Sequence, residues 1–306
     1  MGPYEIDQVQ LAFNPVTLQI LNVVLGLVLF GVALDLKVEH FTALLRNPKA
    51  PLVGITAQFL ILPAVAFALI SVLDIAPSMK LGILLIASCP GGNVSNFLTH
   101  LAKGNTAVSV GMTLISTAAA IITTPLNLTF WGSLNPQTAD LIRDFSLDPL
   151  QMLLTVGVLL GVPLAGGMAL SHFAPTVAAW LRKPFKWLSI AFFLVFVLLA
   201  FGANFRHFLA HIGGVFLPVL LLNTAALALG WGSAWVFGLP SADRRAVSIE
   251  VGIQNSGLGL ILIFNFFDGL GGMAVVAGWW GIWHIIGGLT LATIWGAQRG
   301  RAPQPD

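Results

Sequence analysis

A single acidic side chain lies inside a long apolar stretch of this sequence. Glu250 follows the charged run of Asp243, Arg244 and Arg245 and precedes the polar segment VGIQNSG, all near or within an apolar stretch over residues 246–267. A charge at the centre of a membrane helix costs about 2.5 to 3.5 kcal/mol, so such a group is a functional-site hypothesis by default. The alternative is that Glu250 belongs to the charged end of the stretch. If it lies inside, Glu250 needs a proton or a cation.

Hydroxyl side chains recur at intervals of three and four in an earlier apolar stretch: Thr106, Ser109, Thr113 and Ser116. This spacing places them on one face of a helix. Hydrogen bonding between membrane helices is the simpler explanation. Hydroxyl, amide and carboxylate oxygens are also the hard ligands that a hard cation requires. Such a set is offered by Ser95, Asn96, Ser109, Thr113 and Glu250. One carboxylate among neutral oxygens favours a monovalent ion.

Three further polar side chains stand alone in apolar runs. Gln58 lies in GITAQFLILPAV, and its amide is either functional or bonded to a neighbouring helix. His284, in WWGIWHIIGG, is either an anion contact or an interfacial histidine beside a tryptophan belt. Asn223, in LLLNTAAL, is interpreted as a helix-packing residue.

The elements that position these residues must be membrane helices. Of 306 residues, 57% are apolar, only 8% are charged, and the mean hydropathy is +0.91, whereas a soluble domain carries about 25% charged residues. The solvent of this chain is therefore membrane lipid, and we predict a single membrane domain over residues 1–306. A net charge of +2 excludes a nucleic-acid partner. The lone Cys89 excludes an intrachain disulfide and a thiolate metal site.

Apolar runs of about 20 residues predict nine transmembrane spans. They cover residues 16–35, 51–73, 79–102, 105–131, 149–171, 187–205, 212–237, 246–267 and 272–297. No Lys or Arg precedes Lys37, so a cleavable signal peptide is not expected. Residues 1–15 form a short segment before the first span and residues 298–306 a tail after the last.

The distribution of basic residues predicts the orientation of these spans. With the N-terminus outside, the cytoplasmic segments hold eleven Lys and Arg residues and the outer ones three, namely Lys80, Arg143 and Arg206. Excess Lys and Arg marks the cytoplasmic side. We therefore expect a multi-pass protein, in the inner (plasma) membrane of a bacterium, with its C-terminus in the cytoplasm.

Two of the predicted spans are interrupted. The third contains Cys89-Pro90-Gly91-Gly92-Asn93-Val94-Ser95-Asn96 and the eighth Glu250-Val251-Gly252-Ile253-Gln254-Asn255-Ser256-Gly257. Proline and paired glycines break a helix, and broken backbone at membrane depth must be buried in protein or line a cavity. The breaks lie about 155 residues apart, close to half the chain. Paired interruptions of this kind are the best sequence pointer to a transporter binding site.

These segments resemble the bile acid:sodium symporter family over roughly residues 16–297. The resemblance rests on Cys89-Pro90-Gly91-Gly92 with Ser95-Asn96, Ala102-Lys103-Gly104-Asn105 with Ala107-Val108-Ser109-Val110, Thr124-Pro125, Ile249-Glu250-Val251-Gly252 with Gln254-Asn255-Ser256-Gly257, and Trp283-His284. It implies an all-α membrane fold with inverted repeats, a panel domain and a core domain, and two broken helices that cross at the binding sites. The chain matches the nine-span form, because the region before Val16 has no room for a further crossing.

The resemblance also implies two sodium ions. The first would be bound by Ser95, Asn96, Ser109, Thr113 and Glu250, the set already assembled from ligand chemistry. The second would be bound by Gln58, Glu250, Gln254 and the backbone carbonyls of Val251 and Ile253, which would explain Gln58. In this family the position after Gly92 is often Thr or a small residue, and here it is Asn93.

The substrate is expected at the N-termini of the half-helices after each break, which carry partial positive charge. Asn93, Asn255 and Ser256 should face the anionic group of the substrate, with His284 as a further candidate. The leading hypothesis is a symporter that imports an organic anion, whether bile-acid-like, pantoate-like or a keto acid, together with sodium.

Three other functions compete with this hypothesis. Proton coupling through Glu250 would not need the Ser and Asn ligands. An intramembrane enzyme would need a nucleophile with a base, or paired acids, and the sequence offers neither. A receptor that does not transport would have no need of the sodium ligands, which are all present. The oligomeric state is not predicted.

Overall fold

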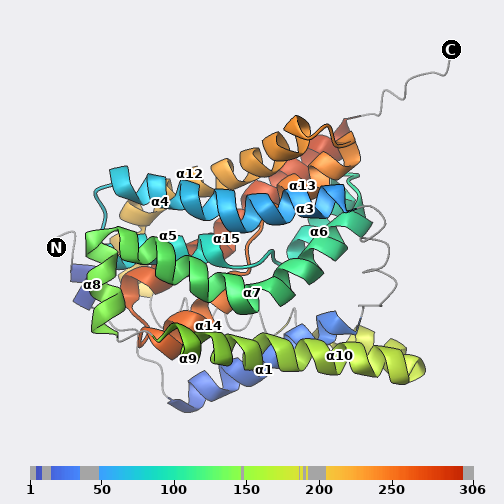
Figure 1. Cartoon of the computed structure of the whole chain (residues 1–306), viewed down its shortest axis with the longest axis horizontal. Helices are drawn as coiled ribbons and strands as arrows, with labels where there is room; N and C mark the ends of the chain where they lie inside the picture. Colours follow the sequence, from blue (N-terminus) through green and yellow to red (C-terminus); the bar gives the residue numbers. More distant parts are fainter. Residues whose placement is uncertain are drawn as a thin grey trace.

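The computed structural model describes residues 5–8, 15–34, 48–145, 148–185, 187–188, 191 and 205–298. Within these ranges the chain is almost entirely helical, and the one extended pairing is an isolated bridge between Gly91 and Gln254. The elements are η1 (Glu5–Gln8), α1 (Pro15–Ala33), α3 (Lys49–Thr56), η2 (Ala57–Ile61), α4 (Leu62–Val72), α5 (Pro77–Ser88), α6 (Val94–Leu101), α7 (Thr106–Leu134), α8 (Pro136–Asp144), α9 (Pro149–Val156), η3 (Gly157–Gly161), α10 (Val162–Phe173), α12 (Phe205–Val236), α13 (Ser241–Gly252), α14 (Ser256–Phe266) and α15 (Gly271–Ala297). Most of the long helices run side by side (Figure 1).

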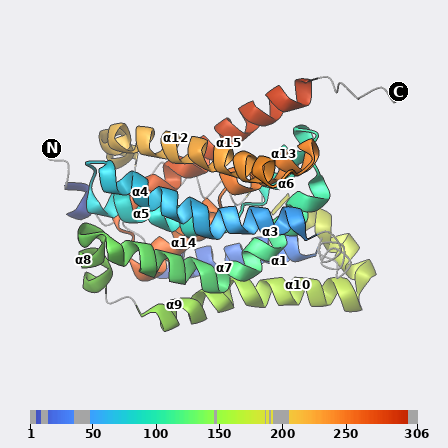
Figure 2. The same ribbon diagram turned by 45° about the horizontal axis from the view of Figure 1, so that its top comes forward.

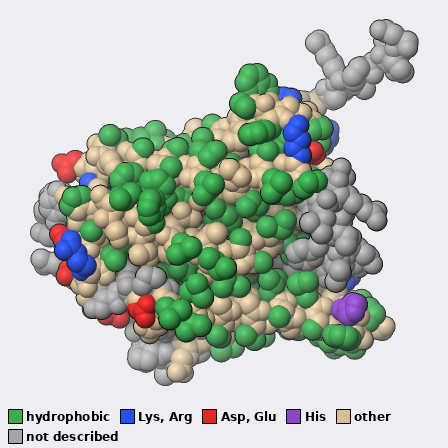
Figure 3. Space-filling view, in the orientation of Figure 1, with side chains coloured by type: hydrophobic (Ala, Val, Ile, Leu, Met, Phe, Trp, Pro, Cys, Tyr) green, Lys and Arg blue, Asp and Glu red, His purple; other side chains and the backbone are tan. Residues whose placement is uncertain are grey.

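Five helices in the described part of the chain are long and apolar enough to cross a membrane. They cover 49–72, 106–134, 150–173, 213–236 and 271–297. The helix over 149–173 exposes Leu150, Leu154, Val158 and Val162 on one stripe, each at least 60% accessible, as lipid-facing residues at helical spacing would be. Apolar side chains cover the middle of the face in Figure 3, and charged groups lie mainly toward its two ends. The chain is an integral, multi-pass membrane protein.

Among the other predicted spans, the first corresponds to α1, and the third and eighth are each divided into two shorter helices. The predicted span over 187–205 lies largely outside the described residues, so the count of nine spans stays a prediction.

The helices form layers around the divided spans. α1 packs along α10 on one side, and α12 lies on the opposite side of the molecule (Figures 1 and 2). Between them, α5 packs against both α7 and α15. α1 meets α14 through a reciprocal amide pair, in which Asn22 donates to Asn265 at 3.3 Å and Asn265 donates back at 3.1 Å.

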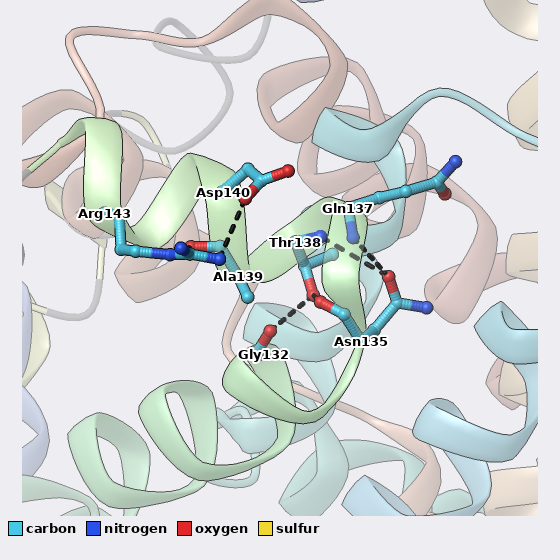
Figure 4. Close-up of polar contacts among 7 residues, drawn as sticks. All are labelled: Gly132, Asn135, Gln137, Thr138, Ala139, Asp140 and Arg143. Atoms are coloured by element: carbon cyan, nitrogen blue, oxygen red, sulfur yellow. Dashed lines mark hydrogen bonds and ion pairs between the residues drawn. The ribbon is translucent and has the colours of Figure 1, made fainter.

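Hydrogen bonds between side chains and backbone groups stabilise the turn between α7 and α8 (Figure 4). The Asn135 side chain accepts from the backbone N–H groups of Gln137 and Thr138, at 3.0 and 3.4 Å, which is a helix N-cap. The buried hydroxyl of Thr138 donates to the carbonyl of Gly132. This turn ends the helix that carries Ser109 and Thr113 and was not predicted as a separate element.

The helix over 49–72 contains a π-helical turn, η2, at its centre. Pro63 cannot donate to a carbonyl one turn before it, and the side chain of Asn127 on α7 donates to that carbonyl, Phe59 O, at 3.0 Å. π-turns are frequent at functional sites. This one contains Gln58, whose side chain is 1% exposed.

Polar contacts fix the ends of the two divided helices. Where α13 begins, Arg245 donates to the carbonyls of Ala102 and Trp295, at the ends of α6 and α15. Where α5 begins, Lys80 donates to Gln137 of α8 at 2.9 Å. The divided helices are therefore anchored at opposite ends of the bundle and extend toward each other at its centre.

Candidate functional site

The two interruptions meet at a helix crossing formed by residues 89–93 and 253–255. The N–H of Gly92 donates to Ile253 O at 2.7 Å, and the N–H of Asn255 donates to Pro90 O at 2.8 Å. Backbone groups at each break have no hydrogen-bond partner within their own helix, and the other break supplies one. This arrangement meets the requirement that non-helical backbone at membrane depth be buried in protein.

Glu250 lies one turn before the helix crossing, on α13, and is 1% exposed. Three hydroxyls donate to its carboxylate. Ser95 donates to Oε2 at 2.5 Å, Ser109 to Oε2 at 3.1 Å, and Thr113 to Oε1 at 2.6 Å. The structure thus brings together three hydroxyl side chains of α6 and α7 and the carboxylate of α13.

The amide of Asn96 joins the same group. Its Oδ1 lies 2.9 Å from Ser109 Oγ and 3.3 Å from Thr113 Oγ1, so it competes with Glu250 as the acceptor of these two hydroxyl groups. We call Ser95, Asn96, Ser109, Thr113 and Glu250 the carboxylate cluster. It brings together five oxygen-bearing side chains, all buried except the partly exposed Asn96, with a single formal negative charge.

A second group of polar atoms also lies at the helix crossing. Gln58 Nε2 donates to Gln254 Oε1 at 2.6 Å and to Cys89 O at 2.9 Å. Gln254 Nε2 donates to Val251 O at 2.7 Å. Gln58 Oε1 is buried and has no hydrogen-bond partner in the described part of the chain. We call Gln58, Gln254 and the carbonyls of residues 251 and 253 the amide cluster.

Gly91 lies against the carboxylate of Glu250. A Cβ atom built on it would stand 2.3 Å from Glu250 Oε1 and 2.9 Å from Cδ. Backbone and carboxylate approach this closely only because residue 91 has no side chain. Glu250 is thus enclosed by the break in the other divided helix.

The arrangement suits a monovalent hard cation. Oxygen donors surround one carboxylate, and buried unpaired acceptors such as Gln58 Oε1 cost free energy unless something binds them. A carbonyl has two lone pairs, so Val251 O and Ile253 O can accept their present hydrogen bonds and still face an ion.

The residues predicted to face the substrate lie around the same crossing. Asn93 is partly exposed and does not cap α6 with its side chain. Asn255 Oδ1 accepts from the N–H of Leu258 at 3.0 Å, so its amide N–H groups remain available as donors. Ser256 is 4% exposed and faces Gly281 of α15.

His284 is also placed at the helix crossing. It lies between Gly281, which faces Ser256, and Gly288, which faces Ile253. The ring is 3% exposed, and its Nδ1 has no partner among the described residues. The side chain is thus buried near the middle of α15 and not at either end of this helix.

Sequence reasoning missed several polar residues that support the site. Thr99 is fully buried and donates to Ser109 Oγ at 3.2 Å. Its spacing of four residues from Ser95 on α6 was the available signal. Asn127, which donates to the carbonyl beside Gln58, follows Pro125 of α7 by two residues and was not singled out.

Divided helices that meet around buried polar side chains at the centre of a membrane bundle are typical of secondary transporters. Residues 22–211, more than half of the chain, match the model of the Sodium Bile acid symporter family. The chain belongs to this family, whose members are sodium-coupled transporters and not enzymes.

Three curated relatives illustrate the family. The chain is 31% identical over 275 residues to the uncharacterized sodium-dependent transporter YocS of Bacillus subtilis. The aligned region covers 90% of this chain and 82% of that protein. It is 30% identical to the probable sodium/metabolite cotransporter BASS1 of Arabidopsis thaliana, over 92% of this chain and 68% of the relative. It is 30% identical to the human ileal sodium/bile acid cotransporter, over 78% and 67%.

Proposed function

We propose that this protein is a symporter that imports an organic anion together with sodium. The observation that carries the proposal is the carboxylate cluster, in which one buried carboxylate is surrounded by neutral oxygen donors at the helix crossing. Relatives described as sodium/metabolite and sodium/bile acid cotransporters support the same function. Proton coupling would leave the three hydroxyls and Asn96 without a role.

Two sodium ions bind in this proposal. The first occupies the carboxylate cluster and is bound by Ser95, Asn96, Ser109, Thr113 and Glu250. The second occupies the amide cluster and is bound by Gln58, Glu250, Gln254, Val251 O and Ile253 O. The unpartnered Oε1 of Gln58 supports the second position. Because Glu250 belongs to both sets, each ion helps to compensate its charge.

The anion binds beside these ions. The N-termini of α6 and α14 point their partial positive charge at the helix crossing, and bound sodium adds to the positive potential there. Asn93, Asn255, Ser256 and His284 orient the anionic group through donors that add no fixed charge. Sodium and anion then bind cooperatively, and each tightens the other by the same factor.

The remaining features of the family fold complete the proposal. The chain is one membrane domain of nine spans, with inverted repeats that form a panel and a core. The N-terminus faces outside and the C-terminus the cytoplasm, because basic residues concentrate on the cytoplasmic side. Reaction of single cysteines at Lys183 and Asp144, which are both exposed, with an impermeant reagent from each side tests this orientation.

Uptake into proteoliposomes tests the proposed function. Each of a panel of organic anions, including bile acids, pantoate and keto acids, is offered under an imposed sodium gradient, a potassium gradient or a pH gradient. We expect at least one anion to accumulate only under the sodium gradient, because the binding arrangement requires that ion. Accumulation driven by the pH gradient without sodium would instead indicate proton coupling.

A further inference from the structure

Divided helices leave carbonyl groups without partners inside the membrane, and side chains of undivided helices satisfy them here. At the end of α5, Thr124 on α7 donates to Ser88 O at 2.7 Å. At the end of α13, Asn223 on α12 donates through Nδ2 to Gly252 O at 2.8 Å. The last carbonyls of a helix have no intrahelical partner. Both breaks therefore depend on a neighbouring helix.

The acceptor of Asn223 lies between two proposed sodium ligands. The carbonyl of Gly252 belongs to the peptide unit between those that carry Val251 O and Ile253 O. Each peptide unit is planar, so fixing the middle one restricts the two units that it joins. Residue 252 is a glycine, the residue type with the greatest backbone freedom. Each ligand carbonyl accepts one further hydrogen bond, Val251 O from Gln254 and Ile253 O from Gly92, and the bond to Gly252 O restrains the peptide unit between them.

The surroundings of Asn223 fit such an anchor. The side chain is 1% exposed. A Cβ atom on Gly287 of α15 would stand 2.8 Å from its Oδ1, and one on Gly252 would stand 2.3 Å from Leu227 of α12. Asn223 thus lies where α12, α13 and α15 meet, and α12 is packed closely against the break.

We propose that Asn223 is a positioning residue for the second sodium site. By holding Gly252 O, it aims the carbonyls of Val251 and Ile253 at the ion without binding the ion itself. The inference rests on the proposed function. Outer partners of metal ligands of this kind alter ion affinity about 10- to 100-fold when they are lost.

A second hydrogen bond between the same two helices provides a matched control. Ser248 on α13 donates to Leu227 O of α12 at 2.7 Å, about one turn from Asn223's acceptor. Both bonds join α12 to α13, but only that of Asn223 ends on a carbonyl at the break. If Asn223 serves only to hold the helices together, Ser248→Ala and an Asn223 variant should have similar effects on the melting temperature and on its dependence on sodium.

The test is a sodium titration of thermal unfolding, at constant ionic strength with potassium as the replacement. Asn223→Leu removes the donor and keeps the branching and the number of side-chain heavy atoms, and Asn223→Asp replaces the donor with an acceptor. We expect both to raise the sodium concentration for half-maximal stabilisation roughly tenfold. Ser248→Ala should lower the melting temperature in potassium and leave that concentration unchanged.

Two results would overturn the inference. One is that the Asn223 variants need the same sodium concentration for half-maximal stabilisation as the wild-type protein. The other is that Ser248→Ala raises this concentration as much as the Asn223 variants do. If one Asn223 variant fails to fold, the other supplies the measurement, and if both fail, Asn223 is a structural residue and the inference is wrong. Absence of any sodium effect in the wild-type protein would contradict the proposed function itself and is distinguishable from these results.

Discussion

Replacing Glu250 with glutamine should abolish sodium-driven anion uptake. Glutamine keeps the size of the side chain but removes the only negative charge of the carboxylate cluster. A buried sodium ion without a counter-charge pays several kcal/mol of desolvation, and every 1.4 kcal/mol is a factor of ten in affinity. Sodium binding should weaken at least ~100-fold, and uptake into proteoliposomes under a sodium gradient should fall to background.

Asp243→Asn is the matched control for this variant. Asp243 is an acid of the same half-helix, but it bonds Asn105 at the end of the bundle, about two turns from Glu250. Its substitution should leave the sodium dependence of uptake unchanged. Glu250→Gln should remain folded, since it removes a buried charge. Sodium-driven uptake by Glu250→Gln at the wild-type rate would show that the carboxylate cluster is not the coupling site.

A single methyl group at Gly91 should have an effect of similar size. In Gly91→Ala the Cβ atom would lie 2.3 Å from Glu250 Oε1, so the carboxylate must move. It cannot move without losing hydrogen bonds from Ser95 and Thr113. We expect sodium affinity to fall on the order of 100-fold, measured as the sodium dependence of uptake and of the melting temperature.

Gly278→Ala separates this steric effect from a general effect of glycine substitution. A Cβ atom at Gly278 of α15 meets nothing within 4 Å, and alanine is about 1 kcal/mol better than glycine inside a helix. This variant should transport normally and be no less stable. The backbone of Gly91 is not left-handed, since the positive-φ glycines of the described residues are Gly238 and Gly269. A normally active Gly91→Ala would therefore mean that Glu250 does not have to stay where it is.

The carboxylate cluster could be predicted from sequence because its signals are local. Proline and paired glycines locate the breaks, and a spacing of four residues places Ser109 and Thr113 on one helical face. An acid in an apolar run has few acceptable environments. These rules state which side chains need partners inside the membrane, so the set of oxygen donors around Glu250 follows from chemistry.

The amide cluster could not be derived in this way. Gln58 and Gln254 are 196 residues apart, and nothing local indicates that they bond. Only the family resemblance had connected them. The π-turn around Gln58 and its support by Asn127 depend on tertiary packing. Asn223 was interpreted as a packing residue, because sequence cannot reveal that its acceptor is the last residue of a divided helix.

Sodium-specific stabilisation of the purified wild-type protein tests the central claim most directly, because it requires no knowledge of the substrate. The melting temperature is measured in potassium chloride and in sodium chloride at equal ionic strength. A ligand that binds only the folded state stabilises it by about 2.7 kcal/mol at 100 times its dissociation constant. The proposed sites predict a melting temperature that rises and saturates with sodium but not with potassium. Equal melting temperatures in the two salts at every concentration would contradict the assignment of Glu250 and its neighbours as sodium ligands.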